Sequence, residues 1–259
     1  MRHGICLNPL VPLRAAATKK SEMTDQVLFG EDFEVLEVNN QWMYIKRGTD
    51  AYEGWFNSRH YLPCTEDRIN QMADSPNYIL HLPFNRLTVD NNPLTLPAGS
   101  ILPFFSRENK SFKLDDLEYI LQENLTEGEN NKRELIEITA RQFLNAPYLW
   151  GGKTIFGMDC SGFTQILYRI AGINIPRDSH QQVNHGTAVN FVEEAQTGDL
   201  AFFINDEGRI THTGIMLEEG RVIHASGKVR VDPIDRHGIY NRELKRYTHR
   251  LEMVKRVID

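Results

Sequence analysis

The strongest constraint on the fold is the apolar stripe that follows Asp159. Four apolar residues recur there at helical spacing: Phe163, Ile166, Leu167 and Ile170. One face of the segment 160–172 must therefore be buried in a helix. Asp159 is a favourable N-cap, and Gly172 is favourable just after the last helical turn. The pattern predicts a buried helix that begins directly after Asp159.

A second helix is predicted before this one, and strands are predicted after it. Residues 132–146 carry a broad apolar stripe that Pro147 ends. The runs GDLAFFIN, THTGIML and RVIHASG have the composition of strands. Helices followed by antiparallel strands indicate an α+β domain.

The first half of the chain is rich in short β-type runs. Residues 1–64 alternate such runs with turns, which is typical of a small barrel. Residues 76–125 repeat this character between prolines that exclude long central strands. Within them, the apolar residues of 114–124 predict a short helix: Leu114, Leu117, Ile120 and Leu121. A polar stretch marks a boundary near residue 128, so we expect domains at 1–70, 71–127 and 128–259.

Composition excludes some classes of protein. The net charge of −6 argues against a nucleic-acid partner, which usually selects a basic surface. No run approaches the ~20 apolar residues that span a bilayer. The first residues resemble a signal peptide only superficially, because Asn8, Pro9 and Pro12 break their apolar run.

The chain has three cysteines, so at least one thiol is free. Cys6 and Cys64 could pair in an oxidising compartment. Cys160 occupies the first turn of the predicted helix, where the helix dipole and unpaired N–H groups favour an anion. A thiolate in that position can have a pKa of about 3.5–7.5. A single unpaired cysteine is more often a buried structural residue than a reactive one. Position alone leaves both interpretations of Cys160 open.

A nucleophilic cysteine needs a base and a group that orients the base. His212 and His224 flank a hairpin whose three-residue loop, Glu218–Gly220, pairs Leu217 with Arg221. Even-numbered residues then share one face of both strands, which places the two histidines diagonally at about 7–8 Å between backbones. Two partly exposed strand residues are the alternative, because a register shift of one residue would separate the faces. The other histidines, such as His60, His81 and His237, are read as surface or core.

Two other kinds of site are conceivable at these positions. Cys160, His212 and His224 are possible zinc ligands, but structural zinc sites normally show paired ligands a few residues apart. The run GGKT at 151–154 matches the end of a nucleotide-binding loop. Its first glycine would fall at Pro147 and no strand precedes it, so this interpretation is rejected.

Short motifs follow one another in the second half: YLWGG, MDCSGF, RDSHQQ, GDLAFF, THTGIML and IHASG. In this order, over residues 132–259, the chain resembles the NlpC/P60 family of papain-like cysteine peptidases, which act on bacterial cell-wall peptides. Permuted relatives, such as the lecithin:retinol acyltransferase-like enzymes, place the histidine before the cysteine, and this chain does not. The resemblance implies a papain-like catalytic domain.

The resemblance also implies roles for individual residues. Cys160 would be the nucleophile, His212 the general base and His224 the group that orients it. Tyr148 would donate a hydrogen bond on the oxyanion side. Three further residues would line the substrate groove: Asp159, Ser161 and Ser179. No metal or organic cofactor would be required.

The front half is similar to a YkfC-like subgroup of this family. Residues 11–31 and 51–57 resemble the first of two bacterial SH3-like domains in γ-D-glutamyl-L-diamino acid endopeptidases, also called dipeptidyl-peptidase VI. Those enzymes cut L-Ala-γ-D-Glu-diamino acid after γ-D-Glu and require a free N-terminal L-Ala. The resemblance implies that the first SH3-like domain leans on the catalytic groove, with Glu22 and Tyr52 as amine contacts. Residues 71–127 would form the second SH3-like domain.

Some questions stay open at this level. A cell-wall peptide-binding protein with an inactive peptidase domain is the alternative function, and an endopeptidase of intact, cross-linked wall is a third. The expected partner is a peptidoglycan-derived peptide containing either meso-diaminopimelate or Lys, and the expected state is a monomer. We expect an envelope location with a leader removed before this numbering, and a cytoplasmic location is the alternative.

Overall fold

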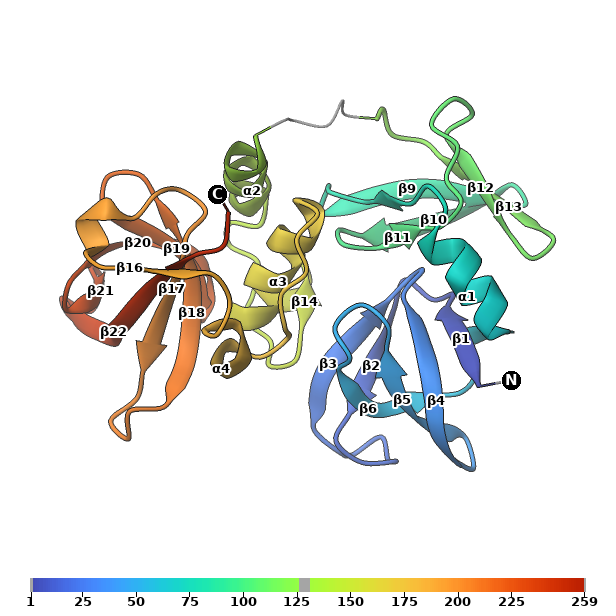
Figure 1. Cartoon of the computed structure of the whole chain (residues 1–259), viewed down its shortest axis with the longest axis horizontal. Coiled ribbons are helices and arrows are strands. Elements are labelled where there is room, and N and C mark those ends of the chain that lie inside the picture. Colours follow the sequence, from blue (N-terminus) through green and yellow to red (C-terminus); the bar gives the residue numbers. More distant parts are fainter. Residues whose placement is uncertain (1, 126–130, 259) are drawn as a thin grey trace. The chain divides into compact units, whose positions relative to one another are not determined.

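The structure is a computed structural model that describes residues 2–125 and 131–258. The chain divides into two compact units, Met1–Gly128 and Glu129–Asp259 (Figure 1). In the part of the chain that is described, no helix has the length and apolar character needed to cross a membrane.

The first unit begins with a seven-stranded antiparallel sheet in the order β3-β2-β6-β5-β4-β1-β7. Its strands are β1 (His3–Cys6), β2 (Leu10–Arg14), β3 (Met23–Leu28), β4 (Asp32–Asn39), β5 (Trp42–Arg47), β6 (Glu53–Asn57) and β7 (Tyr61–Cys64). Alternate side chains, among them Phe33, Ile45 and Phe56, fill a common core. The predicted β-rich character of this segment is confirmed.

The remainder of the first unit is a short helix and two smaller sheets. The helix α1 (Glu66–Ala73) begins at Thr65, whose side chain accepts a hydrogen bond from the N–H of Arg68. A four-stranded sheet has the order β10-β9-β13-β12. Its strands are β9 (Phe84–Val89), β10 (Asn92–Pro97), β12 (Ser111–Leu114) and β13 (Leu117–Leu121), and a separate pair joins β8 (Tyr78–Ile79) to β11 (Ile101–Leu102).

The helix predicted for 114–124 is wrong, because this segment forms a β-hairpin. Asp115 adopts a positive φ of 54° in the tight turn, and Leu114 pairs with Leu117 across it. Tyr119 and Leu121 are buried while Ile120 is exposed. The side chains therefore follow the two-residue period of a strand, and pairing with β9 outweighs the local helical spacing.

The disulfide considered for Cys6 and Cys64 does not form. They lie on neighbouring strands, but the register places Cys64 opposite His3 and Cys6 opposite Tyr61. Residues three positions out of register cannot reach the narrow geometry of a disulfide.

The second unit combines helices with a closed barrel. Its helices are α2 (Lys132–Gln142), α3 (Cys160–Ile170), α4 (Ser179–Gln182) and the short 3₁₀-helix η1 (Val192–Glu194). The barrel strands are β17 (Leu200–Ile204), β18 (Ile210–Leu217), β19 (Arg221–Ser226), β20 (Lys228–Asp235), β21 (Gly238–Asn241) and β22 (Arg246–Arg256). The strand β22 pairs with both β17 and β21 and thereby closes the ring. Three short strands complete the unit: β14 (Lys153–Thr154), β15 (Gly157–Met158) and β16 (Thr187–Val189).

The helix α3 begins and ends where the sequence predicts. The Asp159 carboxylate accepts a hydrogen bond of 2.7 Å from the N–H of Gly162, and Gly172 takes a positive φ of 74° after the last turn. The helix α2 also forms, but it ends at Gln142 rather than immediately before Pro147.

The two faces of the barrel strands serve different purposes. One face carries Phe203, Met216 and Val222 into a core inside the barrel. The other face, which includes Thr213, packs against α3 (Figure 1). The beginning of α3 and the beginning of β18 are thereby held together by a rigid core.

Candidate active site

The two predicted histidines are in direct contact. Leu217 pairs with Arg221, as the hairpin loop predicts. Nε2 of His212 lies 2.8 Å from Nδ1 of His224. Both rings are buried, at 7% and 1% exposure. The register prediction is confirmed, and it brings a base and an orienting group within hydrogen-bonding distance.

Cys160 is the first residue of α3 and is 6% exposed. Its sulfur is within hydrogen-bonding reach of the backbone N–H groups of Ser161 and Thr213. Thr213 follows His212 directly on β18, and α3 packs against that strand. The structure therefore brings together the three residues predicted to be catalytic.

Burial acts against a thiolate at Cys160. Burial, with a contribution from Asp159, raises the pKa of Cys160 to about 12, although the two backbone N–H groups act against it. Burial, together with His224 and His249, holds the pKa of His212 well below its usual value. Removal from water disfavours both charged forms more than the helix N-terminus favours an anion. Both shifts favour the neutral thiol and the neutral imidazole near pH 7.

Alkylation should report this neutral state. We expect the rate of Cys160 modification by iodoacetamide to rise about tenfold per pH unit above neutral pH, because the thiolate fraction rises in that way below the pKa. The measurement is modification at Cys160 by peptide mass spectrometry, with Cys160→Ala as the control for the assignment. A fast reaction that stays constant from pH 6 to pH 8 would instead show a stable thiolate–imidazolium pair.

A carboxylate that sequence reasoning missed completes the histidine pair. Nε2 of His224 lies 3.1 Å from Oδ2 of Asp232 on β20. Asp232 also accepts hydrogen bonds of 2.5 and 2.9 Å from Nε and Nη2 of Arg230. Ser226 pairs with Lys228 across a turn at Gly227. Extending the hairpin pattern through that glycine would have placed Asp232 on the same face as His224.

His249 was also missed, and no local signal marks it. It lies on β22, and its ring stacks on that of His212 with centroids 4.2 Å apart and planes at 28°. Burial lowers the pKa of His249 to about 4. Its position depends on pairing between segments about fifty residues apart, which propensity cannot reveal.

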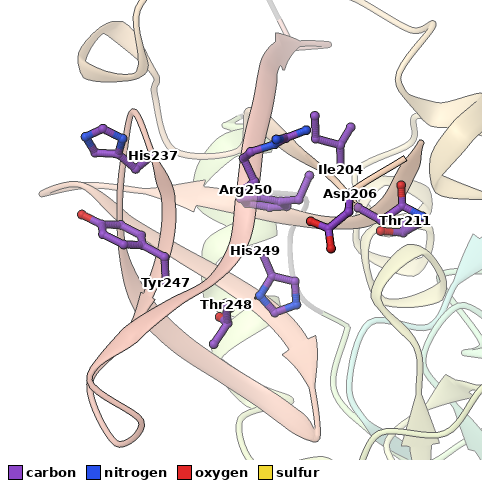
Figure 2. A pocket seen from close by; sticks show the side chains of 10 residues that line it. Ile204, Asp206, Thr211, His237, Tyr247, Thr248, His249 and Arg250 are labelled. Carbon is purple, nitrogen blue, oxygen red and sulfur yellow. Dashed lines mark hydrogen bonds between the residues drawn. The ribbon is translucent and has the colours of Figure 1, made fainter. Parts of the chain in front are cut away.

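A pocket of about 680 Å³ opens on the side of His249 (Figure 2). Asp206 and Thr211 lie on one side of this ring, and His237 and Tyr247 lie on the other side (Figure 2). Neither Cys160 nor His212 is among the residues that line the pocket. This pocket is therefore adjacent to the histidine cluster but does not contain its reactive atoms.

Asp159 and Ser161 are tied to a buried arginine that sequence reasoning missed. Arg177 donates to both carboxylate oxygens of Asp159, at 2.6 and 3.0 Å, and to Oγ of Ser161 at 2.9 Å. Asp159 accepts a further bond of 2.9 Å from the N–H of Gly151. These contacts stabilise the start of α3. Ser179 is the half-buried first residue of α4, and the role of all three predicted groove residues stays a prediction.

Tyr148 lies in the loop before β14 and is 37% exposed. Burial raises its pKa to about 12, with contributions from Cys160 and Asp159, so the phenol keeps its proton and can donate a hydrogen bond. Its own N–H donates to the carbonyl of Gly227 at 3.0 Å. The placement is compatible with the predicted donor role.

The two predicted amine contacts lie in the first unit. Glu22 is exposed just before β3, and its carbonyl accepts a hydrogen bond from the N–H of Ala15 at 3.1 Å. The ring of Tyr52 packs against the core of the seven-stranded sheet, with the guanidinium of Arg47 5.8 Å from its centroid. Substrate contact by either residue stays a prediction.

The zinc alternative receives no geometric support from the histidines. Their facing nitrogens bond to each other and do not converge on a common point. Over residues 2–125 and 131–258, no group of three or more His, Cys, Asp or Glu side chains is arranged to hold a metal ion.

Comparison with known proteins identifies both parts of the chain. Residues 145–248 match the NlpC/P60 family, and residues 13–60 match the bacterial dipeptidyl-peptidase SH3 domain. A γ-D-glutamyl-L-lysine dipeptidyl-peptidase of Bacillus cereus is 28% identical, over 85% of this chain and 73% of the relative. Dipeptidyl-peptidase 6 of Lysinibacillus sphaericus is 25% identical, over 93% of this chain and 96% of the relative.

Solved structures show the same fold. The crystal structure of an NlpC/P60 family protein from Bacillus cereus superposes with a TM-score of 0.79 at 19% identity, covering 99% of this chain and 100% of the other. The SH3 match ends at residue 60, so a second SH3-like domain in 71–127 stays a prediction. The chain therefore carries an NlpC/P60 domain, with a bacterial dipeptidyl-peptidase SH3 domain in front of it.

Proposed function

We propose that the chain is a cysteine peptidase that hydrolyses the γ-D-glutamyl–diamino acid bond of peptidoglycan stem peptides. The observation that carries this proposal is the buried His212–His224 contact beside Cys160 at the capped start of α3. A thiol, a base and an orienting group in that order are the requirements of covalent acyl transfer. The names of the two dipeptidyl-peptidase relatives support the choice of bond.

The reaction starts from the neutral thiol. His212 takes the proton from Cys160 as the sulfur attacks the γ-carbonyl carbon of D-Glu. The first-turn N–H groups of α3 and the hydroxyl of Tyr148 stabilise the oxyanion, where one donor is typically worth about 2.7–4 kcal/mol. Because the proton moves only as the bond forms, the buried site never has to hold an isolated thiolate.

The second half of the reaction reverses these roles. His212 gives its proton to the amine of the departing diamino acid, and the C–N bond breaks to leave a thioester on Cys160. Water, deprotonated by His212, then attacks the thioester and releases L-Ala-γ-D-Glu, and the sulfur regains its proton. Each proton that leaves Cys160 or water passes through one ring nitrogen of His212.

Peptide digestion tests the function. Incubation with L-Ala-γ-D-Glu-L-Lys, or with the meso-diaminopimelate counterpart, should release L-Ala-γ-D-Glu, detected by mass spectrometry. The matched control is the isomer in which D-Glu is linked through its α-carboxyl group. Equal cleavage of the α-linked and γ-linked peptides, or no cleavage of either γ-linked peptide, would contradict the proposal.

A free amino terminus should be required. We expect N-acetylation of the substrate to lower kcat/KM at least about 100-fold, because a site that binds an ammonium group leaves its acceptors unpaired when the charge is removed. Glu22 is proposed as the carboxylate partner, so Glu22→Gln should reduce this discrimination mainly through KM. Glu37→Gln, which changes another exposed glutamate of the same unit, is the control.

The ratio of kcat/KM for free and acetylated peptide checks both statements. A ratio near one in the wild-type protein would favour an endopeptidase of intact wall. A ratio equally large in the wild type and in Glu22→Gln would remove Glu22 from the site but leave the peptidase function standing. The location in the cell envelope and the monomeric state stay predictions.

A further inference from the structure

Asp232 and Arg230 end a chain of hydrogen bonds that leads to His212. Asp232 is 3% exposed. Its Oδ2 accepts hydrogen bonds from Nε of Arg230 at 2.5 Å and from Nε2 of His224 at 3.1 Å. Nδ1 of His224 then meets Nε2 of His212 at 2.8 Å. The chain links β20, β19 and β18 across the barrel.

The positions of the protons follow from this order. An ionised carboxylate only accepts, so Nε2 of His224 carries a hydrogen. A neutral imidazole has one N–H, which leaves Nδ1 of His224 as an acceptor. Nε2 of His212 must then be the donor at the next contact. Nδ1 is then the nitrogen of His212 that carries an available lone pair.

Burial keeps both imidazoles neutral near pH 7. It lowers the pKa of both His212 and His224, so each ring carries a single N–H. The hydrogen bonds from His224 and Arg230 hold the pKa of Asp232 below its usual value against the effect of burial. His249 faces the ring of His212 from β22, but it stacks on the ring and does not occupy its nitrogens.

We propose that Asp232, held by Arg230, is a positioning residue that fixes both histidines as Nε2–H tautomers and so presents the Nδ1 lone pair of His212 as the base for Cys160. This role rests on the proposed function and names a further residue that it requires. Arg230 clamps both oxygens of Asp232, and Arg230 is itself 3.4 Å from Glu243. The clamp prevents the carboxylate from rotating away from His224.

The same chain stabilises the protonated base. When Nδ1 of His212 takes the thiol proton, the ring becomes a cation that still donates from Nε2 to His224. The buried carboxylate at the end of the chain offsets that positive charge across the intervening ring. Without it, a cation would arise in a buried site beside the neutral His249.

Asp232→Asn is the informative substitution because it keeps size and removes the negative charge. Arg230 donates to both oxygens of Asp232, so either orientation of the amide sets its NH₂ against an N–H of Arg230 and weakens the hold on His224. We expect kcat to fall about 100-fold to 1000-fold while KM changes less than about threefold; loss of the orienting carboxylate in a comparable triad costs about 10⁴. Asp235→Asn is the matched control, because this carboxylate lies three residues further along the strand and accepts hydrogen bonds from Tyr247 and the N–H of His237 instead.

Nitrogen NMR of the histidine rings tests the proposal directly. In the wild-type protein, ¹⁵N shifts should assign both His212 and His224 to the Nε2–H tautomer, and the weakened hold in Asp232→Asn should add a population of Nδ1–H tautomers. Nδ1–H tautomers in the wild type would overturn the proposal. So would a kcat for Asp232→Asn equal to that of Asp235→Asn, with thermal unfolding confirming that both variants are folded.

The outcomes separate this proposal from the proposed function. A wild-type protein that cleaves no stem peptide contradicts the function, and the tautomers can still be read by NMR. A wild-type protein that cleaves the peptide while Asp232→Asn cleaves it equally fast contradicts only the role of Asp232.

Discussion

Cys160→Ala is expected to lower the hydrolysis of γ-D-glutamyl stem peptide by about 10⁴-fold or more. Alanine preserves the start of α3, because the N-cap bond runs from Gly162 to the Asp159 side chain and does not involve the sulfur. It removes the only atom that forms the covalent intermediate. Loss of the nucleophile alone costs nearly as much as loss of the whole triad, since the remaining residues have nothing to activate.

Release of L-Ala-γ-D-Glu, followed by liquid chromatography, measures this effect. Cys64→Ala is the matched control, because it removes a buried free thiol from the first unit. Calorimetric titration of Cys160→Ala with the intact peptide should still show binding. Undiminished hydrolysis by Cys160→Ala would leave the wall-peptide-binding alternative as the better account of the chain.

Arg177→Met is expected to lower the free energy of unfolding by about 3–5 kcal/mol. Arg177 and Asp159 form an ion pair at 2.6 Å with side-chain exposures of 1% and 6%. Methionine keeps much of the volume but leaves the Asp159 carboxylate buried without its charge partner. Activity should fall as well, because Asp159 caps the helix that begins with Cys160.

Urea denaturation at neutral pH measures the loss, with the transition of the second unit followed separately from that of the first. Arg209→Met is the control, because the Arg209–Glu207 pair is 78% and 64% exposed and should contribute less than about 1 kcal/mol. The double variant Arg177→Met with Asp159→Asn should recover part of the stability by removing the unpaired charge. An equal loss of unfolding free energy in the Arg177 and Arg209 variants would show that the buried ion pair contributes no more to stability than the exposed one.

Local patterns predicted the parts of the site that depend on neighbouring residues. The N-cap at Asp159 and the positive φ at Gly172 bound α3 as expected. The Glu218–Gly220 loop determined the hairpin register, and the register determined that His212 meets His224. Each of these relations spans fewer than fifteen residues, which is the range where propensity and turn chemistry are informative.

The same kind of reasoning failed where packing overrode propensity. The apolar spacing of 114–124 fits a helix, yet the segment pairs with β9 and forms a strand. The pKa of Cys160 depends on packing in the same way. Helix position alone favours an anion at Cys160, which would lower its pKa. The barrel and α3 bury the sulfur, and this burial raises the pKa instead.

The sequence by itself determined which residues could do chemistry and in which order they lie along the chain. It identified Cys160, His212 and His224, because helix capping, hairpin register and motif order each depend on residues that are close together in the sequence. Only the tertiary structure decided their charge states and their outer partners. Asp232 reaches the site through the next hairpin, whereas Arg177 and His249 reach it through packing between separate elements and through barrel closure. The exclusion of water that sets the pKa values exists only once those elements have come together.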